Sequence, residues 1–224
     1  MLLPEIRPHI AIPPLFRQPE GARDFLLSGG ILIYPTETFY AMGCLADNQK
    51  AAEKILRLKR RLPGKTLPLL AGSIEQAEAA AQLDAAPREL LEKFWPGPLT
   101  ILLPAKPTVS GCSVNTRGLC AIRVSASPEA ASLANLFKMP LVSTSANISG
   151  DDAVAAMADL HSGLFGDGAC GLALWQASHQ AKSRLPSTIV HPLRGPSGGW
   201  IIKIIRSGLI DKADLESENW AIEE

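Results

Sequence analysis

A polar segment follows the first buried-looking apolar run of the chain. Residues 31–34 are apolar, and Thr36 and Thr38 after them flank the carboxylate of Glu37. In α/β proteins, ligands bind where a strand ends in a loop. The two threonines could therefore hydrogen-bond a small polar substrate, and Glu37 could accept from an amine or steer a metal. The alternative is a turn whose hydroxyl groups satisfy the local backbone.

The densest run of charge is basic. Residues 54–65 hold six cations with no acid between them: Lys54, Arg57, Lys59, Arg60, Arg61 and Lys65. Like charges this close repel one another, and a bound anion would relieve the repulsion. Arginine offers a planar fork to phosphate oxygens, and lysine offers a point charge. A polyphosphate is therefore a suitable ligand for this run. The alternative is a solvated basic helix end, which the helix dipole favours.

A second polar segment follows the apolar pair Leu141 and Val142. Within seven residues the chain places five small polar side chains: Ser143, Thr144, Ser145, Asn147 and Ser149. A plain turn rarely needs so many hydroxyl groups directly after a strand, so the segment favours a site for a phosphate, a carboxylate or a nucleobase edge. Residues 186–188 and 206–208 are weaker examples, whereas residues 95–100 are better explained as a rigid bend.

Standard nucleotide and hydrolase motifs do not explain the sequence. Residues 64–66 resemble the end of a Walker A loop, but the glycine that the motif needs at position 59 is a lysine. The sequence has no G-x-G-x-x-G after a strand and no G-x-S-x-G elbow. Its four cysteines form no C-x-x-C pair and have no histidine at metal-ligand spacing. We therefore expect no metal bound by protein side chains.

Composition and charge limit the classes of protein to which this chain could belong. The 224 residues are 46% hydrophobic and 20% charged, which is ordinary for a globular domain. Lys+Arg and Asp+Glu are both 22, and this zero balance argues against a dedicated nucleic-acid coat protein. No apolar stretch approaches the length of a membrane span, and the N-terminus carries charge and prolines where a signal peptide would be apolar. These features predict a reduced, cytoplasmic protein.

Strand and helix patterns are interspersed from end to end. We expect strands at 31–34, 67–71, 99–103, 121–124, 141–144, 172–174, 188–190 and 200–205. We expect helices at 22–28, 48–61, 128–138 and 153–165, and one or two within 73–94. No linker divides them, so we predict one α/β domain with a mixed sheet over residues 21–210. An extended, proline-rich arm would precede it at 1–20, and an acidic tail would follow at 211–224.

Taken together, the motifs resemble the YrdC-like family, the threonylcarbamoyl-AMP synthases. The family pattern is Y-P-T-E-T-x-Y-G-L-G, K-x-R-P, P-G-P-x-T, an arginine in a strand, S-x-S-A-N-x-S-G, P-S-T and R-x-G. Its counterparts here are, in chain order, residues 34–43, 59–62, 96–100, Arg123, 143–150, 186–188 and 206–208. Each motif alone is weak, but the ordered set is specific. The resemblance implies the short, single-domain form: a twisted, open, mixed sheet with flanking helices and a concave basic cleft.

The resemblance also implies an activity. A nucleotidyltransferase of this family, an L-threonylcarbamoyladenylate synthase, converts L-threonine, bicarbonate or CO2, and ATP into threonylcarbamoyl-AMP and pyrophosphate. Mg²⁺ would accompany the ATP. A downstream threonylcarbamoyl transferase complex would use the product to make N6-threonylcarbamoyladenosine in tRNA. Positioning of the substrates and neutralisation of their charge would account for most of the rate acceleration, so we expect no serine or cysteine nucleophile.

Residue roles follow from the matched motif positions. The resemblance assigns ATP binding to six residues: Lys59, Arg61, Lys65, Ser145, Asn147 and Arg206. Lys59 and Arg61 would be the catalytic pair that holds the phosphates. It assigns threonine binding to four residues, Thr38, Arg123, Ser143 and Ser187, with Arg123 as the clamp on the threonine carboxylate.

Several positions depart from the family pattern. Ala41 and Met42 replace the usual glycine and leucine, Leu62 replaces the proline after Arg61, and Leu70 stands where some members have a histidine. These changes bear on amino-acid specificity and affinity more than on the reaction class. One alternative is a non-catalytic, RNA- or nucleotide-binding YrdC/YciO-like protein that contacts tRNA or double-stranded RNA directly. Another, a carbamoyl-phosphate-using relative, would need acylphosphatase and zinc-finger modules that this sequence lacks.

Overall fold

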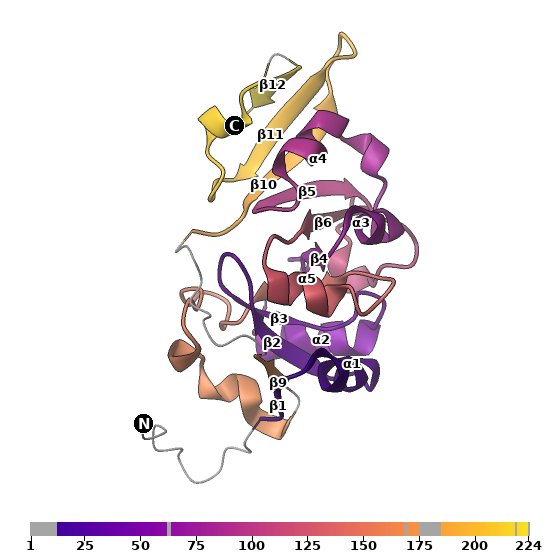
Figure 1. Cartoon of the computed structure of the whole chain (residues 1–224). Helices are drawn as coiled ribbons and strands as arrows, with labels where there is room; N and C mark the ends of the chain where they lie inside the picture. The colour runs from indigo at the N-terminus through magenta and orange to yellow at the C-terminus, as the bar shows by residue number, and fades with distance from the viewer. Residues whose placement is uncertain (1–12, 62–63, 169, 175–184, 218, 224) are drawn as a thin grey trace.

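The strands form two mixed sheets in a computed structural model that describes residues 13–61, 64–168, 170–174, 185–217 and 219–223. The five-stranded sheet has the order β1 (Leu15–Phe16), β9 (Cys170–Ala173), β2 (Ile31–Pro35), β3 (Tyr40–Gly43), β8 (Thr144–Ser145). The seven-stranded sheet has the order β12 (Trp220–Glu223), β11 (Trp200–Arg206), β10 (Thr188–Arg194), β5 (Leu99–Pro104), β6 (Leu119–Val124), β4 (Leu69–Ala71), β7 (Leu141–Val142). Figure 1 shows β10–β12 at one end of the molecule and β1 and β9 at the other.

The two sheets meet where the chain passes from β7 to β8. Ser143 is the single residue between these strands, and its amide donates to the carbonyl of Pro68, 2.8 Å away. One residue earlier, the amide of Val142 donates to the carbonyl of Cys44 at 2.8 Å. Ser143 therefore lies at the junction of the two sheets, and the polar segment that follows it begins there.

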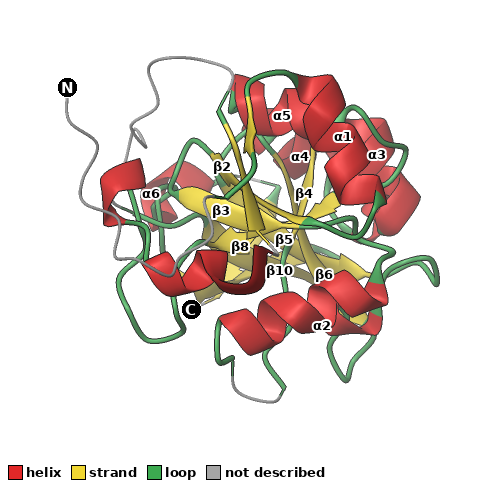
Figure 2. Ribbon diagram, turned by 90° about the horizontal axis from the view of Figure 1, so that it is seen from below, coloured by secondary structure: helices red, strands yellow, loops and turns green. Residues whose placement is uncertain are grey.

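Helices cover the strands on both sides. They are α1 (Pro19–Leu27), α2 (Gln49–Leu58), α3 (Ile74–Ala80), α4 (Arg88–Phe94), α5 (Pro128–Ala134) and α6 (Lys212–Leu215). Short 3-10 segments lie at η1 (Leu83–Ala85), η2 (Gly111–Ser113), η3 (Met157–Asp159) and η4 (Ser162–Gly168). Helices α1 and α5 contact β2, whereas α2 contacts β3, and Figure 2 shows α2 on the opposite side of the strands from α1 and α5. The α/β prediction is confirmed, with the strands in two sheets.

Local sequence explains where α2 and α5 begin. The Asn48 side chain accepts from the amide of Ala51 at 3.0 Å, which caps α2, and this helix buries Ala51, Ala52 and Ile55. Ser127 caps α5, and the next residue is a proline at the first helical position. The two helices contribute to different clusters of the core: the buried apolar residues of α2 belong to the larger cluster, whereas those of α5 belong to the smaller one, together with α1 and residues of the neighbouring strands.

The structure differs from the sequence prediction in four places. Residues 153–165 form two 3-10 segments after an extended stretch, because the carbonyl of Val154 accepts from the amide of Tyr40 at 2.8 Å instead of bonding within a helix. Residues 40–43, for which no strand was expected, form β3.

The range 211–224, expected as a tail, contains α6 and β12. Leu215 and Trp220 are buried, and the Trp220 indole donates to the Leu215 carbonyl at 2.8 Å. At the other end, α1 begins at Pro19, inside the range expected as an arm, and residues 1–12 lie outside the described part of the chain.

Candidate active site

A cavity of about 280 Å³ lies where the two sheets meet. Its lining includes residues of β3 and β8 from one sheet and of β4, β5, β6, β10 and β11 from the other. The loop at 36–39, the segment at 143–145, Thr100 and Ser187 contribute hydroxyl groups to it. Segments that are far apart in sequence thus converge on one site, as expected where strands end at a switch between sheets.

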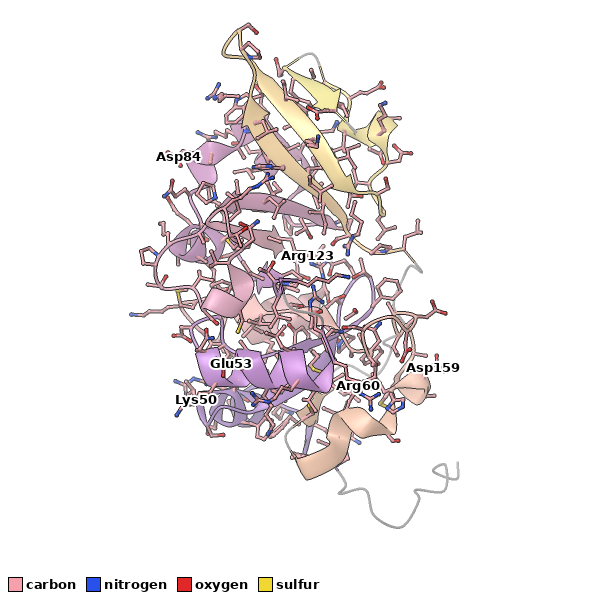
Figure 3. All side chains as sticks on the ribbon, turned by 180° about the vertical axis from the view of Figure 1, so that it is seen from behind. Lys50, Glu53, Arg60, Asp84, Arg123 and Asp159 are labelled. Carbon is pink, nitrogen blue, oxygen red and sulfur yellow. The ribbon has the colours of Figure 1, made fainter. Side chains whose placement is uncertain are left out.

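Three arginines from different segments line this cavity: Arg61 after α2, Arg123 in β6 and Arg206 in β11. Burial lowers the pKa of Arg206 from its usual value, and the positive charges of Arg123 and Arg61 lower that pKa further. Burial alone lowers the pKa of Arg61. Because a guanidinium stays protonated at neutral pH, the cavity concentrates positive charge that an anion would relieve. Figure 3 shows Arg123 near the middle of the molecule, while Arg60 lies at the end of α2.

Backbone carbonyl groups and one hydroxyl group hold two of these guanidinium groups. Arg61 donates from Nη2 to the carbonyl of Thr66 at 2.8 Å and from Nε to that of Lys65 at 3.2 Å. Arg206 donates from Nη2 to the carbonyl of Ser187 at 2.6 Å and to its hydroxyl at 3.1 Å. Neither arginine is neutralised by these contacts, because carbonyl and hydroxyl groups orient a cation without cancelling its charge.

Glu37 supports Arg123 from outside the cavity lining. Its Oε1 accepts from Nη1 of Arg123 at 2.5 Å, and its Oε2 accepts from the Ser125 hydroxyl at 2.7 Å. The two side chains of the ion pair are 12% and 9% exposed. Both carboxylate oxygens are thus used within the protein, which favours a positioning role for Glu37 over contact with an amine or a metal. Among the described residues, no group of three His, Cys, Asp or Glu side chains could hold a metal ion.

The hydroxyl groups of the cavity form local pairs. The hydroxyl oxygens of Thr36 and Thr38 lie 3.1 Å apart, and the Thr36 hydroxyl also donates to the carbonyl of Phe39 at 2.7 Å. Thr36 therefore satisfies the backbone of a local turn. The Thr100 hydroxyl lies 2.8 Å from that of Ser187. Thr100 lines the cavity although the sequence reasoning gave it no role; its place at the end of the P-G-P-x-T motif was the available signal.

Lys59 and Asn147 lie behind the cavity lining. Lys59 is 1% exposed, and its ammonium donates to the carbonyl of Ser145, to the carbonyl of Asn147 at 2.8 Å and to Oδ1 of Asn147 at 3.1 Å. Burial, and secondarily the charge of Arg61, lower the pKa of Lys59 to about 8. Lys65 is exposed and also lies outside the lining. Of the six cations in the basic run, Arg61 is the one that lines this cavity.

Of the ten residues to which the family resemblance assigns a role, seven line the cavity: Thr38, Arg61, Arg123, Ser143, Ser145, Ser187 and Arg206. Of the departures from the family pattern, Ala41 also lines it. Leu70 does not, since it is fully buried in the smaller core cluster, and Leu62 lies outside the described residues. In the part of the chain that is described, no helix is both long and apolar enough to cross a bilayer.

Comparison with known proteins identifies the family. The family model Sua5_yciO_yrdC, described as telomere recombination, matches residues 24–208. The chain belongs to the Sua5/YciO/YrdC family. The crystal structure of P. abyssi Sua5 complexed with L-threonine is similar, with 26% identity, a TM-score of 0.76, and coverage of 95% of this chain and 63% of that one.

Two further structures place the chain within this family's fold. A variant of P. abyssi Sua5 is 26% identical with a TM-score of 0.78, covering 95% of this chain and 65% of that one. E. coli YciO is 20% identical with a TM-score of 0.71, covering 89% of this chain and 98% of that one. This member of the Sua5/YciO/YrdC family thus spans less than two thirds of the P. abyssi Sua5 chains and nearly all of YciO.

Proposed function

We propose that this protein is an L-threonylcarbamoyladenylate synthase, which forms threonylcarbamoyl-AMP and pyrophosphate from L-threonine, bicarbonate and ATP. The observation that carries the proposal is the convergence of Arg61, Arg123 and Arg206 on one cavity lined with hydroxyl groups. Such a site suits two anions at once, a carboxylate and a polyphosphate. Membership of the family, and the L-threonine held by the similar P. abyssi Sua5, support the choice of substrates.

Arg123 is suited to the threonine carboxylate. The Nη1 of Arg123 donates to Glu37. Among the described residues, the Nε and Nη2 of Arg123 have no hydrogen-bond partner. These two nitrogens form a fork that can bind a carboxylate through two parallel hydrogen bonds. Thr38, Ser143 and Ser187 line the same cavity and would bind the polar atoms of the amino acid, and the Ser187 hydroxyl lies next to that of Thr100.

Arg61 and Arg206 are suited to the phosphates. Ser145 also lines the cavity, and its hydroxyl donates a hydrogen bond of 2.6 Å to Oδ1 of Asn147, which lies outside the lining. The threonine amine would take up CO2 as a carbamate, and a carbamate oxygen would attack the α-phosphate while pyrophosphate leaves. The arginines would stabilise the negative charge that grows on the phosphate oxygens. Mg²⁺ would come with the phosphate oxygens of ATP, because the described residues offer it no cluster of carboxylates.

The proposed place in metabolism follows from the product. Threonylcarbamoyl-AMP is an activated acyl donor, so a transferase complex would use it for N6-threonylcarbamoyladenosine in tRNA, in the cytoplasm. The rival proposal is a YciO-like protein that binds nucleotide or RNA without catalysis, and it predicts binding with no product.

The deciding experiment incubates the protein with ATP, bicarbonate and one amino acid at a time, and detects the acyl adenylate and pyrophosphate directly. We expect product with threonine and a loss of about 100-fold or more in the Arg61→Ala variant, because an oriented cation is removed from the developing charge. Arg57→Ala is the matched control, since this arginine is exposed in the same basic run and lies outside the cavity lining. Binding of ATP with no adenylate for any amino acid would refute the proposal in favour of the non-catalytic rival.

A further inference from the structure

The buried ammonium of Lys59 is attached to one loop. Lys59 follows the last turn of α2, and its side chain reaches residues 145–147, which are distant in sequence. A lysine ammonium has three N–H donors, and three acceptors surround this one: two carbonyls and the Oδ1 of Asn147. The ammonium therefore has no remaining proton to offer to a phosphate in this arrangement.

The main chain of Lys59 holds the same loop. Its carbonyl accepts from the amide of Ser149 at 2.8 Å, so one residue contacts the loop through both its backbone and its side chain. Within the loop, the Ser145 hydroxyl donates to Oδ1 of Asn147, and Nδ2 of Asn147 donates to the carbonyl of Asp151, each at 2.6 Å. Asn147 thus connects the lysine to both ends of residues 145–151.

Arg61, two residues further on, lies differently. It lines the cavity, and its Nε and Nη2 bond carbonyls of its own segment. Among the described residues its Nη1 has no hydrogen-bond partner. The two cations of the K-x-R motif therefore have separate surroundings: one is enclosed by the loop, and the other faces the cavity.

We propose that Lys59 is a positioning residue that holds residues 145–151 in the conformation that brings Ser145 to the cavity, and that it does not bind phosphate itself. The nucleotide part of this proposal rests on the proposed function, whereas the anchoring of the loop does not. Enclosure of the charged group by the loop explains why Lys59 is 1% exposed although it carries a charge. The arginines of the cavity then carry the contacts with phosphate.

The first test measures amide hydrogen exchange in residues 145–151 with no ligand present. Lys59→Met keeps the length of the side chain and removes its donors, so we expect exchange there to rise about tenfold or more, as local opening becomes easier. Arg61→Met is the matched control because it removes one cation from the same segment, and we expect it to leave exchange in 145–151 unchanged. Unchanged exchange in Lys59→Met would overturn the proposal.

The second test measures ATP affinity against salt concentration. An arginine that contacts phosphate contributes a charge interaction that salt screens, so Arg61→Met should weaken binding and flatten its salt dependence. Lys59→Met should weaken binding while leaving the salt dependence as in the wild type. A flattening in Lys59→Met equal to that in Arg61→Met would instead identify Lys59 as a phosphate ligand.

Lys59→Arg provides the decisive variant if Lys59→Met does not fold. A guanidinium can replace an ammonium at a phosphate but is too large for the small space between three oxygens. We expect Lys59→Arg to raise exchange in 145–151 and to lose ATP affinity about tenfold, whereas retained affinity would overturn the proposal. If the wild type binds no ATP, the proposed function fails, and the exchange measurement still decides the role of Lys59 in the loop.

Discussion

Replacing Glu37 by glutamine tests the electrostatics of the cavity, because Glu37 is the carboxylate that pairs with one of its three arginines. The substitution keeps the volume of the side chain and one acceptor oxygen, and removes the negative charge. Arg123 then keeps a neutral hydrogen bond in place of an ion pair at 2.5 Å. The positive charge in the cavity also becomes less compensated, since Arg123 and Arg61 are both close enough to Arg206 to lower its pKa.

The size of the effect follows from burial. Hydrogen bonds to charged groups contribute about 1.5–3 kcal/mol, and removing one partner of a fully buried ion pair costs about 3–5 kcal/mol. Here the side chains are 12% and 9% exposed, and the cavity beside them admits water. The glutamine retains part of the contact. We therefore expect the free energy of unfolding to fall by about 1.5–3 kcal/mol in Glu37→Gln.

Urea unfolding with and without pyrophosphate measures both consequences. The control is Glu92→Gln, which removes an exposed partner of Arg88 in a pair with a similar distance of 2.6 Å, and we expect a much smaller loss of stability there, because water screens an exposed pair. Pyrophosphate should stabilise Glu37→Gln more than the wild type, because the stability that a ligand of the folded state adds increases with the logarithm of its affinity. Equal losses in both variants, or equal stabilisation by pyrophosphate, would refute the reasoning.

Of three further predictions, two concern the stability of the fold, and one concerns the titration of Lys59. Trp220→Ala should lower the free energy of unfolding by about 3–5 kcal/mol in urea, because the indole is buried and its Nε1 bonds the Leu215 carbonyl. Gly43→Ala should prevent soluble expression, since a Cβ there would overlap the carbonyl oxygen of Val142. The lowered pKa of Lys59, about 8, means that the folded state loses this proton before the unfolded state does. Stability measured in urea should therefore rise between about pH 8 and pH 10.4, and the rise should be smaller in Lys59→Met.

Much of the fold could be predicted because its signals are local. The serine and proline at 127–128 predict the start of α5, and the apolar run at 31–34 predicts β2. The prediction for 153–165 was wrong because the alanines there fit a helix, while the deciding hydrogen bond from Tyr40 to Val154 joins two segments far apart in sequence. The range 211–224 looked like a tail for the same reason: what buries Trp220 is packing and pairing with the neighbouring strand β11.

The site could be predicted where a motif residue lies in or directly beside a strand. Arg123, Ser145 and Arg206 lie in strands, and each lines the cavity. Lys59 and Asn147 were expected at the nucleotide by the same motifs and lie behind the lining. Sequence spacing does not fix the direction of a long side chain at the end of a helix, so it could not separate Lys59 from Arg61.

The distribution of cations explains how a chain of zero net charge could hold the polyanion of the proposed reaction. The basic run at 54–65 is the densest in the sequence, but it supplies Arg61 alone to the cavity lining. The other two arginines of the lining come from β6 and β11, which lie beyond position 118. Local density of charge in the sequence is therefore a weaker guide to an anion site than convergence of strands. It follows that removing the exposed Arg57 should matter far less to ATP binding than removing Arg206, although only Arg57 belongs to the basic run.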